Sequence, residues 1–248
     1  MRAILTWHSI DASGSVVSVA PNAFRAQLEA IRHLGLRVVG VPELLALPDE
    51  VQAVALTFDD GFRNFRTEAW PLLRSHGFPA TVFVVSGHVG SDNRWRDRTD
   101  AGIPVLPLMA WDDLAALHAE GLALGAHTRT HAHLPTLNDA AVEEELTGAA
   151  AEIAQRTGAR VTGFAYPYGE VDARVAARTA THFDWACTTE YAALRGAGRP
   201  ELLPRLDAWY FRDPRRLADW GSARFRAGIW LRRQARRVRA SLRPSAAA

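Results

Sequence analysis

Short apolar runs alternate along the chain with segments in which apolar side chains recur every three or four residues. The runs predict strands over 2–7, 37–41, 53–58, 80–85, 122–126, 161–166 and 183–187. The periodic segments predict helices, with starts expected at Pro21, Asp112 and Asn138 or Asp139, and ends at Gly35, Gly77, Gly121 and Gly158. Because strand and helix follow one another in turn, we expect parallel strands with crossover helices. Seven or eight such strands in one domain predict an α/β fold of the closed or nearly closed (β/α) barrel type.

Polar residues with reactive side chains follow several of these strands directly. His8 comes after the first strand, Asp59 and Asp60 after the third, His127 after the fifth and Tyr168 soon after the sixth. In a (β/α) barrel the carboxyl ends of all strands open on the same face, where catalytic loops gather. The pattern therefore predicts that these distant residues meet at one site.

Asp60, His127 and His131 form a candidate ligand set for a divalent metal ion. The two histidines are four residues apart, which on a helical turn would place them on the same face. Two imidazoles and one carboxylate are a common set for a catalytic metal. Asp59 is then free to act as a base. The alternatives are a solvated pair of histidines and two aspartates that cap a turn.

Three motifs together resemble the polysaccharide deacetylases, also called NodB-homology proteins or carbohydrate esterase family 4. They are Thr-Phe-Asp-Asp-Gly at 57–61, His-Thr-Arg-Thr-His at 127–131 and Tyr-Pro-Tyr-Gly at 166–169. The resemblance covers 1–211 and implies a catalytic domain with a distorted (β/α) barrel, followed by an Arg-rich extension at 212–248. It also implies removal of acetyl groups from N-acetylhexosamine units of a glycan or its precursor. The expected cofactor is a divalent ion, zinc ahead of nickel, cobalt or manganese.

The resemblance assigns a role to most of the candidate residues. It implies that Asp59 takes the proton from the attacking water while Asp60 binds the metal with the two histidines. The backbone N–H of Tyr168 would donate to the oxyanion that forms on the carbonyl. Judged on its own, Tyr-Pro-Tyr-Gly favours an ordinary turn.

The chain departs from the familiar pattern at two positions. Many relatives carry an arginine where this chain has Ala165, and that arginine holds the base aspartate. Either Arg205 replaces it here, or Asp59 is tuned differently. The usual acid histidine near the end of the domain is also missing, since 202–211 contain none. The chain resembles the poly-N-acetylglucosamine deacetylase-like subgroup, in which the acid histidine comes from the N-terminal strand, and this resemblance implies that role for His8. The alternative is a polar residue that ends a strand.

A few further side chains are candidates for lining the substrate site. His133 lies close to the second motif and is the next candidate acid. Pro167 belongs to the third motif, and Trp95 or Trp111 would stack on a sugar ring if it is not part of the core. Two rival functions remain open: hydrolysis of another, small or cyclic amide, and glycan binding without catalysis.

The charge of the chain is unevenly distributed. Eleven arginines against two aspartates give 212–248 a charge of +9, and because the whole chain is +2 the remainder carries −7. Arginines interleaved with aromatic residues suggest either an interfacial helix on an anionic membrane or a helix packed on the barrel. The acidic main part argues against nucleic acid as a partner. No secretory signal is visible, so we expect a cytoplasmic protein or one at the cytoplasmic membrane face.

Overall fold

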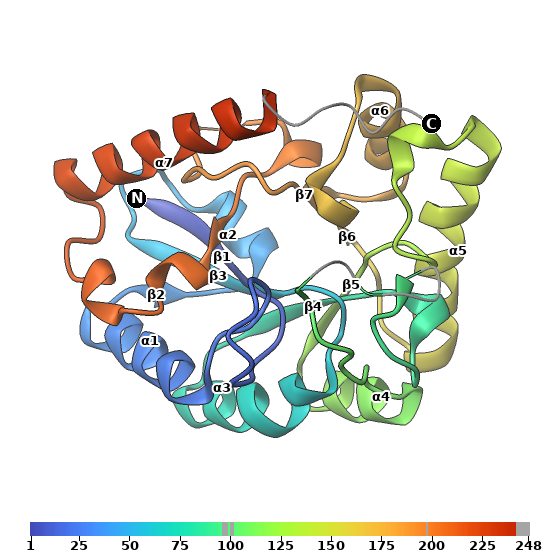
Figure 1. The fold of residues 1–248 in the computed structure, drawn as a ribbon, viewed down its shortest axis with the longest axis horizontal. Coiled ribbons are helices and arrows are strands. Elements are labelled where there is room, and N and C mark those ends of the chain that lie inside the picture. Colours follow the sequence, from blue (N-terminus) through green and yellow to red (C-terminus); the bar gives the residue numbers. More distant parts are fainter. Residues whose placement is uncertain (96–98, 100–101, 197, 242–248) are drawn as a thin grey trace.

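The computed structural model describes residues 1–95, 99, 102–196 and 198–241, and its elements follow the predicted β-then-α order (Figure 1). The strands are β1 (Arg2–Trp7), β2 (Arg37–Val38), β3 (Ala53–Phe58), β4 (Ala80–Val84), β5 (Ala123–Ala126), β6 (Gly163–Ala165), β7 (Trp185–Cys187) and β8 (Leu206–Asp207). The helices are α1 (Pro21–His33), α2 (Val41–Ala46), α3 (Trp70–His76), α4 (Trp111–Ala119), α5 (Asp139–Thr157), α6 (Ala173–His182) and α7 (Ala223–Ser241).

The described strands form one curled, parallel sheet in the order β7-β6-β5-β4-β3-β1-β8, with β2 beside the first half of β3. The segment 203–207 links the two edges of this sheet. Leu203 bridges to Cys187 at the end of β7, and Leu206 pairs with Leu5 in β1. The sheet thus curls toward closure, which confirms the predicted distorted (β/α) barrel.

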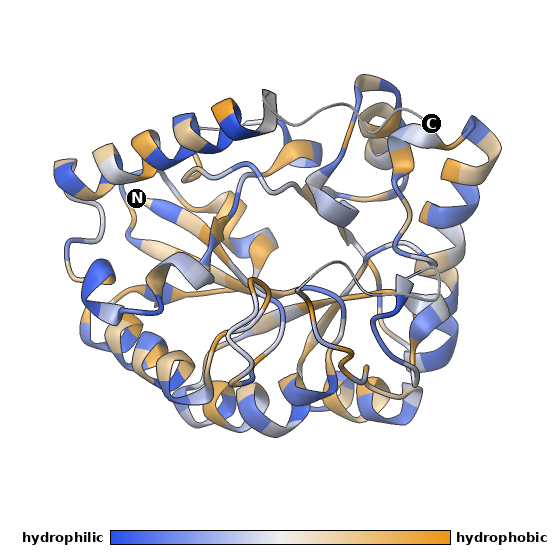
Figure 2. Cartoon of the chain, viewed as in Figure 1, coloured by the Kyte–Doolittle hydropathy of each residue, from blue (hydrophilic) through white to orange (hydrophobic). Residues whose placement is uncertain are grey.

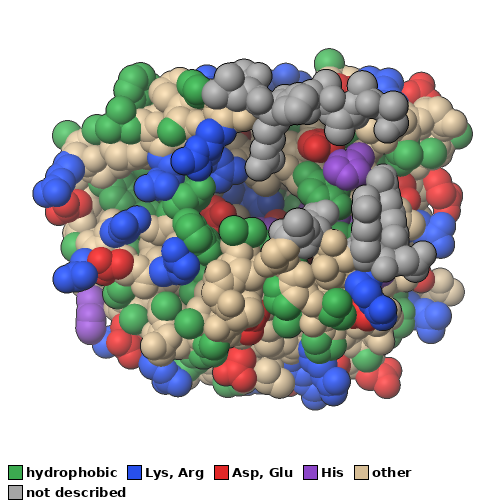
Figure 3. Space-filling view, in the orientation of Figure 1, with side chains coloured by type: hydrophobic (Ala, Val, Ile, Leu, Met, Phe, Trp, Pro, Cys, Tyr) green, Lys and Arg blue, Asp and Glu red, His purple; other side chains and the backbone are tan. Residues whose placement is uncertain are grey.

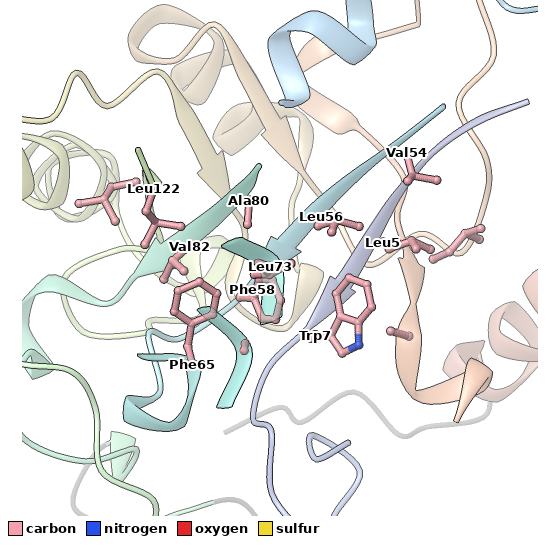
Figure 4. Close-up of a cluster of buried hydrophobic side chains, with 14 of the residues drawn as sticks. Leu5, Trp7, Val54, Leu56, Phe58, Phe65, Leu73, Ala80, Val82 and Leu122 are labelled. Atoms are coloured by element: carbon pink, nitrogen blue, oxygen red, sulfur yellow. The ribbon is translucent and has the colours of Figure 1, made fainter. Parts of the chain in front are cut away.

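The apolar runs that predict strands are buried because helices cover the outside of the sheet. All six residues of β1 and all six of β3 are buried. At their ends the rings of Trp7 and Phe58 stack with centroids 5.3 Å apart, inside the cluster that Figure 4 shows. Apolar residues are concentrated along the central strands, whereas the outer helices mix apolar and hydrophilic positions (Figure 2). Burying such rings contributes about 1.5–3 kcal/mol each, so this cluster fixes the register of β1 against β3.

The ends of the elements differ in detail from the sequence pattern. Gly77 and Gly158 adopt the left-handed conformation at the ends of α3 and α5, as expected. Of the two candidate caps of α5, Asn138 accepts the N–H of Ala141. Asp112, expected to cap a helix, lies inside α4 instead: the cap residue is Ala110, and the carboxylate of Asp113 accepts its N–H. The two-residue strand β8 is too short to leave an apolar run that sequence reasoning can find.

The segment after residue 211 packs onto the barrel through an apolar side. Leu217, Trp220, Phe225 and Ile229 are buried in the same cluster as the strands. The opposite side of α7 exposes Trp230, Leu231 and Val238. The boundary at residue 211 stays a prediction. Among the described residues, no helix is long and apolar enough to cross a membrane.

Candidate active site

His8 and Asp59 are neighbours because their strands are paired in register. Trp7 pairs with Phe58 at the carboxyl ends of β1 and β3, so the next residue of each strand emerges at the same point. His8 Nε2 lies 3.6 Å from Asp59 Oδ2, and the imidazole is 27% exposed. The acid candidate therefore lies beside the base candidate.

Arg205 holds both oxygens of Asp59. Its Nη1 donates to Oδ1 at 2.6 Å and its Nη2 to Oδ2 at 2.8 Å, a bidentate pair that is almost completely buried. The guanidinium is fixed in turn by the Thr6 hydroxyl and the Thr188 carbonyl, both at 3.0 Å. Burial by itself raises the pKa of Asp59, but Arg205 and the nearby histidines outweigh it and hold the pKa below its usual range. Asp59 is therefore an ionised carboxylate at neutral pH.

Asp60, His127 and His131 converge as a metal-binding set. Asp60 Oδ1 lies 3.4 Å from Nε2 of each histidine, and the three residues are buried with their ligand atoms within 4.8 Å of one another. Within the described part of the chain, Asp60 Oδ1 is buried without a hydrogen-bond partner. A buried carboxylate oxygen between two imidazole nitrogens fits a divalent cation, because the ion satisfies all three atoms. Burial alone would raise the pKa of Asp60, but the two histidines hold it well below its usual range.

The two histidine ligands are not on a helix, so the predicted helical turn is wrong. Residues 127–131 form a loop after β5, in which Thr128 and His131 have φ values of 65° and 57°. The carboxylate of Glu145 in α5 fastens this loop by accepting the N–H of Arg129 at 2.7 Å and that of Thr130 at 3.0 Å. The histidines meet because the loop reverses there, and their spacing of four residues is incidental.

Neighbouring groups orient the two imidazoles. The Ala165 carbonyl accepts a hydrogen bond from His127 Nδ1 at 2.6 Å, which leaves the lone pair of Nε2 for the metal. The ring of Trp95 stacks on His131 with centroids 4.6 Å apart. Burial lowers the pKa of His131, which favours the neutral ligand form. Trp95 thus supports a metal ligand, and as a buried residue it is not available as a platform for a sugar.

Tyr168 borders the metal-binding residues in a strained turn. Its φ is 60°, and its ring lies 4.6 Å from His131 and 4.1 Å from His133, on which it stacks. His133 is held by Glu170 through a 2.7 Å contact, and Pro167 is buried beneath the turn. A Cβ on Gly169 would lie 2.0 Å from Thr189 Oγ1, so the turn also requires a glycine there. His133 and Pro167 therefore support Tyr168.

Left-handed backbone conformations gather at this site. Among the described residues, the non-glycine residues with positive φ are Asp60, Thr128, His131 and Tyr168. Such conformations cost about 1–3 kcal/mol each for residues with a Cβ and persist where the surroundings impose them. Their concentration at the metal-binding residues marks a preorganised site.

Several supporting residues are invisible to sequence reasoning. Glu145 is one of three consecutive glutamates, Thr6 is an ordinary strand residue, and Thr188 directly follows β7. No motif distinguishes them, since their importance comes from tertiary contacts. Conversely, Trp111 packs against the core at the start of α4, with the Arg156 guanidinium 5.9 Å from its ring. None of the contacts described for Trp111 links it to the metal-binding residues.

Known proteins resemble this chain in sequence. A profile of the polysaccharide deacetylase family matches residues 47–182. YxkH of Bacillus subtilis (strain 168) is 23% identical over 197 residues, which cover 77% of this chain and 65% of YxkH. The poly-beta-1,6-N-acetyl-D-glucosamine N-deacetylase of Escherichia coli (strain K12) is 31% identical over 93 residues, 34% of this chain and 14% of that protein. The chain thus spans less than two thirds of each of these relatives.

Solved structures show the same fold. IcaB from Ammonifex degensii superposes with a TM-score of 0.70 at 23% identity, covering 84% of this chain and 94% of that one. The polysaccharide deacetylase BC0361 from Bacillus cereus gives 0.69 at 24% identity, covering 83% and 64%. At these identities the likeness establishes architecture. The profile match extends over more than half of the sequence, and the chain belongs to the polysaccharide deacetylase family.

Proposed function

We propose that this chain is a metal-dependent N-deacetylase that removes acetyl groups from N-acetylhexosamine units of a glycan or a glycan precursor. One observation carries the proposal: the metal-binding set of Asp60, His127 and His131 lies directly beside Asp59, a buried carboxylate held by Arg205. Family membership supplies the reaction class, and the poly-N-acetylglucosamine deacetylases among the relatives supply the substrate class.

Asp59, Tyr168 and His8 have different roles in the hydrolysis of the amide. Asp59 accepts a proton as a water oxygen bonds to the acetamide carbon. The Tyr168 N–H donates to the oxyanion that develops on the carbonyl oxygen. His8 gives a proton to the amide nitrogen as the C–N bond breaks, which releases acetate and the sugar amine. A divalent ion, when bound, supplies Lewis acidity that polarises the carbonyl and acidifies water.

Metal dependence belongs to the family, and the identity of the ion is part of this proposal. Asp60, His127 and His131 would hold it. Two imidazole nitrogens and one carboxylate oxygen, with open positions left for water and substrate, suit zinc in a catalytic site. Nickel, cobalt and manganese also accept such a set. Elemental analysis of the purified chain identifies the ion.

The experiment that tests the function is acetate release from a panel of N-acetylated sugars by the metal-loaded chain. Asp59→Asn is the matched control, because the amide keeps the shape of the side chain but cannot take the proton. We expect acetate release to fall about 100-fold or more in this variant, with metal content unchanged. A metal-loaded wild-type chain that releases no acetate, or an Asp59→Asn variant as fast as wild type, would contradict the proposal.

The two rival functions are less well supported. A protein that only binds glycan has no need of a carboxylate beside its metal site that is buried and ionised by a dedicated arginine. Hydrolysis of a small or cyclic amide would use the same residues, and turnover on the sugar panel separates it from deacetylation.

Contact with an anionic membrane is a further part of the proposal, and nucleic acid is not expected as a partner. The observation behind it is that Trp230 and Leu231 on α7 are 57% and 61% exposed beside several arginines. Such a surface suits the headgroup region of a cytoplasmic leaflet. Co-sedimentation with phosphatidylglycerol vesicles tests it: binding should weaken in a Trp230→Ala/Leu231→Ala variant. Equal binding of both proteins would contradict the membrane contact.

A further inference from the structure

A groove of about 660 Å³ lies between the Tyr168 turn and α7. One side of it is formed by the Tyr168 turn and by Thr189, and the other side carries four arginines of α7. These arginines are Arg233, Arg236, Arg237 and Arg239. Figure 3 shows basic side chains gathered beside α7, around a hollow in this face of the molecule. The groove therefore begins at the candidate active site and runs along a basic wall.

Three of the four arginines of the groove are held by hydrogen bonds, and the group of four is not neutralised. Glu190, the one carboxylate among the described lining residues, accepts from Arg233 Nε at 2.9 Å and from Arg237 Nη2 at 2.8 Å. Arg236 Nη2 donates to the Thr189 carbonyl at 3.2 Å. Four guanidiniums against one carboxylate leave an excess of three positive charges. Each guanidinium offers five N–H donors and a carboxylate accepts about four hydrogen bonds, so donors remain for a second anion.

The groove and the metal-binding residues share a wall. The ring of Tyr168 lines the groove and lies 4.6 Å from that of His131. Thr188, which also lines the groove, accepts a hydrogen bond from Arg205 Nε at 3.0 Å. Tyr168 thus borders both the metal-binding residues and the groove, so the groove is the neighbouring space for a substituent of a sugar bound at the metal-binding residues.

We propose that the groove binds a phosphate group of the substrate, so that the sugar deacetylated here is a phosphorylated N-acetylhexosamine. The inference rests on the proposed function. A phosphate ester carries up to two negative charges and accepts bidentate hydrogen bonds from guanidinium groups, which matches several adjacent arginines. A sugar carboxylate would offset only one of the three excess charges. The phosphate belongs either to a free sugar phosphate or to a sugar linked to a lipid through phosphate.

Calorimetric binding tests the groove without requiring turnover. The probes are N-acetylglucosamine 1-phosphate, neutral N-acetylglucosamine and glucuronic acid, each titrated into the purified full chain. The test variant is Arg236→Gln/Arg239→Gln, which leaves both partners of Glu190 in place. Arg224→Gln is the matched control, because this side chain is 90% exposed on the same helix and lies outside the groove.

We expect the sugar phosphate to bind more tightly than either other probe. The double variant should lose about 10- to 100-fold in affinity for it, and the control should lose none. Equal affinity for phosphate and carboxylate sugars, or unchanged affinity in the double variant, would overturn the inference. The affinity can be measured even if the chain releases no acetate. A failure of the proposed function can therefore be told apart from a failure of the groove to bind phosphate.

Turnover then identifies the source of the phosphate. If the proposed function holds, kcat/KM for the sugar phosphate should exceed that for the neutral sugar, and the double variant should remove the difference. A preference for a polyprenyl diphosphate-linked N-acetylglucosamine over the soluble 1-phosphate assigns the lipid-linked form. Equal values of kcat/KM for the lipid-linked sugar and the soluble 1-phosphate assign the free sugar phosphate. A kcat/KM for the neutral sugar as high as for either phosphate would overturn the inference.

Discussion

The two carboxylates of the site are adjacent in sequence but are supported in different ways. Asp59 continues a central buried strand, and Arg205, Thr6 and Thr188 fix its position from the core of the barrel. Asp60 turns out of the strand with a φ of 71° and meets histidines from a loop that Glu145 and the backbone N–H groups of Ser86 and Gly87 hold. The base candidate thus depends on the fold as a whole, whereas the metal-binding set depends on local loop contacts.

Because of this difference, substitutions around Asp59 and substitutions in the loop at 127–131 should have different effects. Damage around Asp59 should appear as lost stability together with lost activity, since the barrel closure and the Asp59–Arg205 pair use the same segment, 203–207. Damage to the loop at 127–131 should appear as lost metal affinity in a protein that still folds. Single substitutions in the two parts of the site distinguish these two outcomes.

Removing a metal ligand should have the largest effect on activity. In His127→Ala the chain should lose its divalent ion and its acetate release should fall about 1,000-fold or more, since a Lewis acid contributes several kcal/mol to the barrier. The free energy of unfolding of the metal-free protein should change little by comparison. Elemental analysis and acetate release measure the two effects, with His33→Ala, an exposed histidine at the end of α1, as the control. Full metal occupancy in His127→Ala would refute the ligand assignment.

Removing the partner of Asp59 should instead weaken the fold. Arg205→Ala leaves a buried carboxylate without its opposite charge, which destabilises proteins by about 3–5 kcal/mol. Urea denaturation measures the free energy of unfolding. The control is Arg199→Ala, which breaks a pair with Glu201 in which the arginine is 64% exposed and should cost less than about 1 kcal/mol. Equal stability of the two variants would show that the buried pair does not hold the barrel.

The sequence predicts the residues that follow paired strands, His8 and Asp59, better than it predicts the loop at 127–131. The runs at 2–7 and 53–58 appear as strands with those bounds because buried strands leave uninterrupted apolar residues. His8 and Asp59 follow from the ends of these strands. The loop at 127–131 is wrongly predicted as a helical turn because its left-handed residues, Thr128 and His131, have side chains that give no signal of a positive φ.

Partners that come from distant segments are the hardest to predict. In a chain whose 29 basic residues are all arginine, composition does not distinguish the arginine that reaches Asp59. Arg205 is a candidate only because the resemblance requires an arginine near Asp59 and this chain has Ala165 at the usual position. For Glu145 no such expectation exists, since one of three consecutive glutamates on a helix is most often solvated.

The next prediction concerns His8, which shares a strand register with the base. His8→Ala should lower turnover about 100-fold and leave metal content intact, because a sugar amine leaves poorly without a proton donor. The alkaline limb of the pH–rate profile should disappear, since that limb reports loss of the acid form. His133→Ala serves as the comparison, because His133 stacks on Tyr168 and pairs with Glu170. A limb that survives in His8→Ala and disappears in His133→Ala would transfer the role of the acid to His133.

The smallest and most discriminating effect should come from Glu145, which touches neither metal nor base. Glu145→Gln removes the negative charge that strengthens the hydrogen bonds from the N–H groups of Arg129 and Thr130, while the amide oxygen can still accept them. Changes in the supports of metal ligands typically cost about 10- to 100-fold in metal affinity, and we expect the lower end here. Competition with a chelator of known affinity measures the loss. Glu144→Gln is the matched control, since the Glu144 side chain is 65% exposed and its described contact is with the side chain of Arg129, not with the backbone of the loop. If Glu145→Gln lowers the free energy of unfolding but not metal affinity, the loop is supported by the whole fold, as Asp59 is, and the contrast between the two halves of the site is wrong.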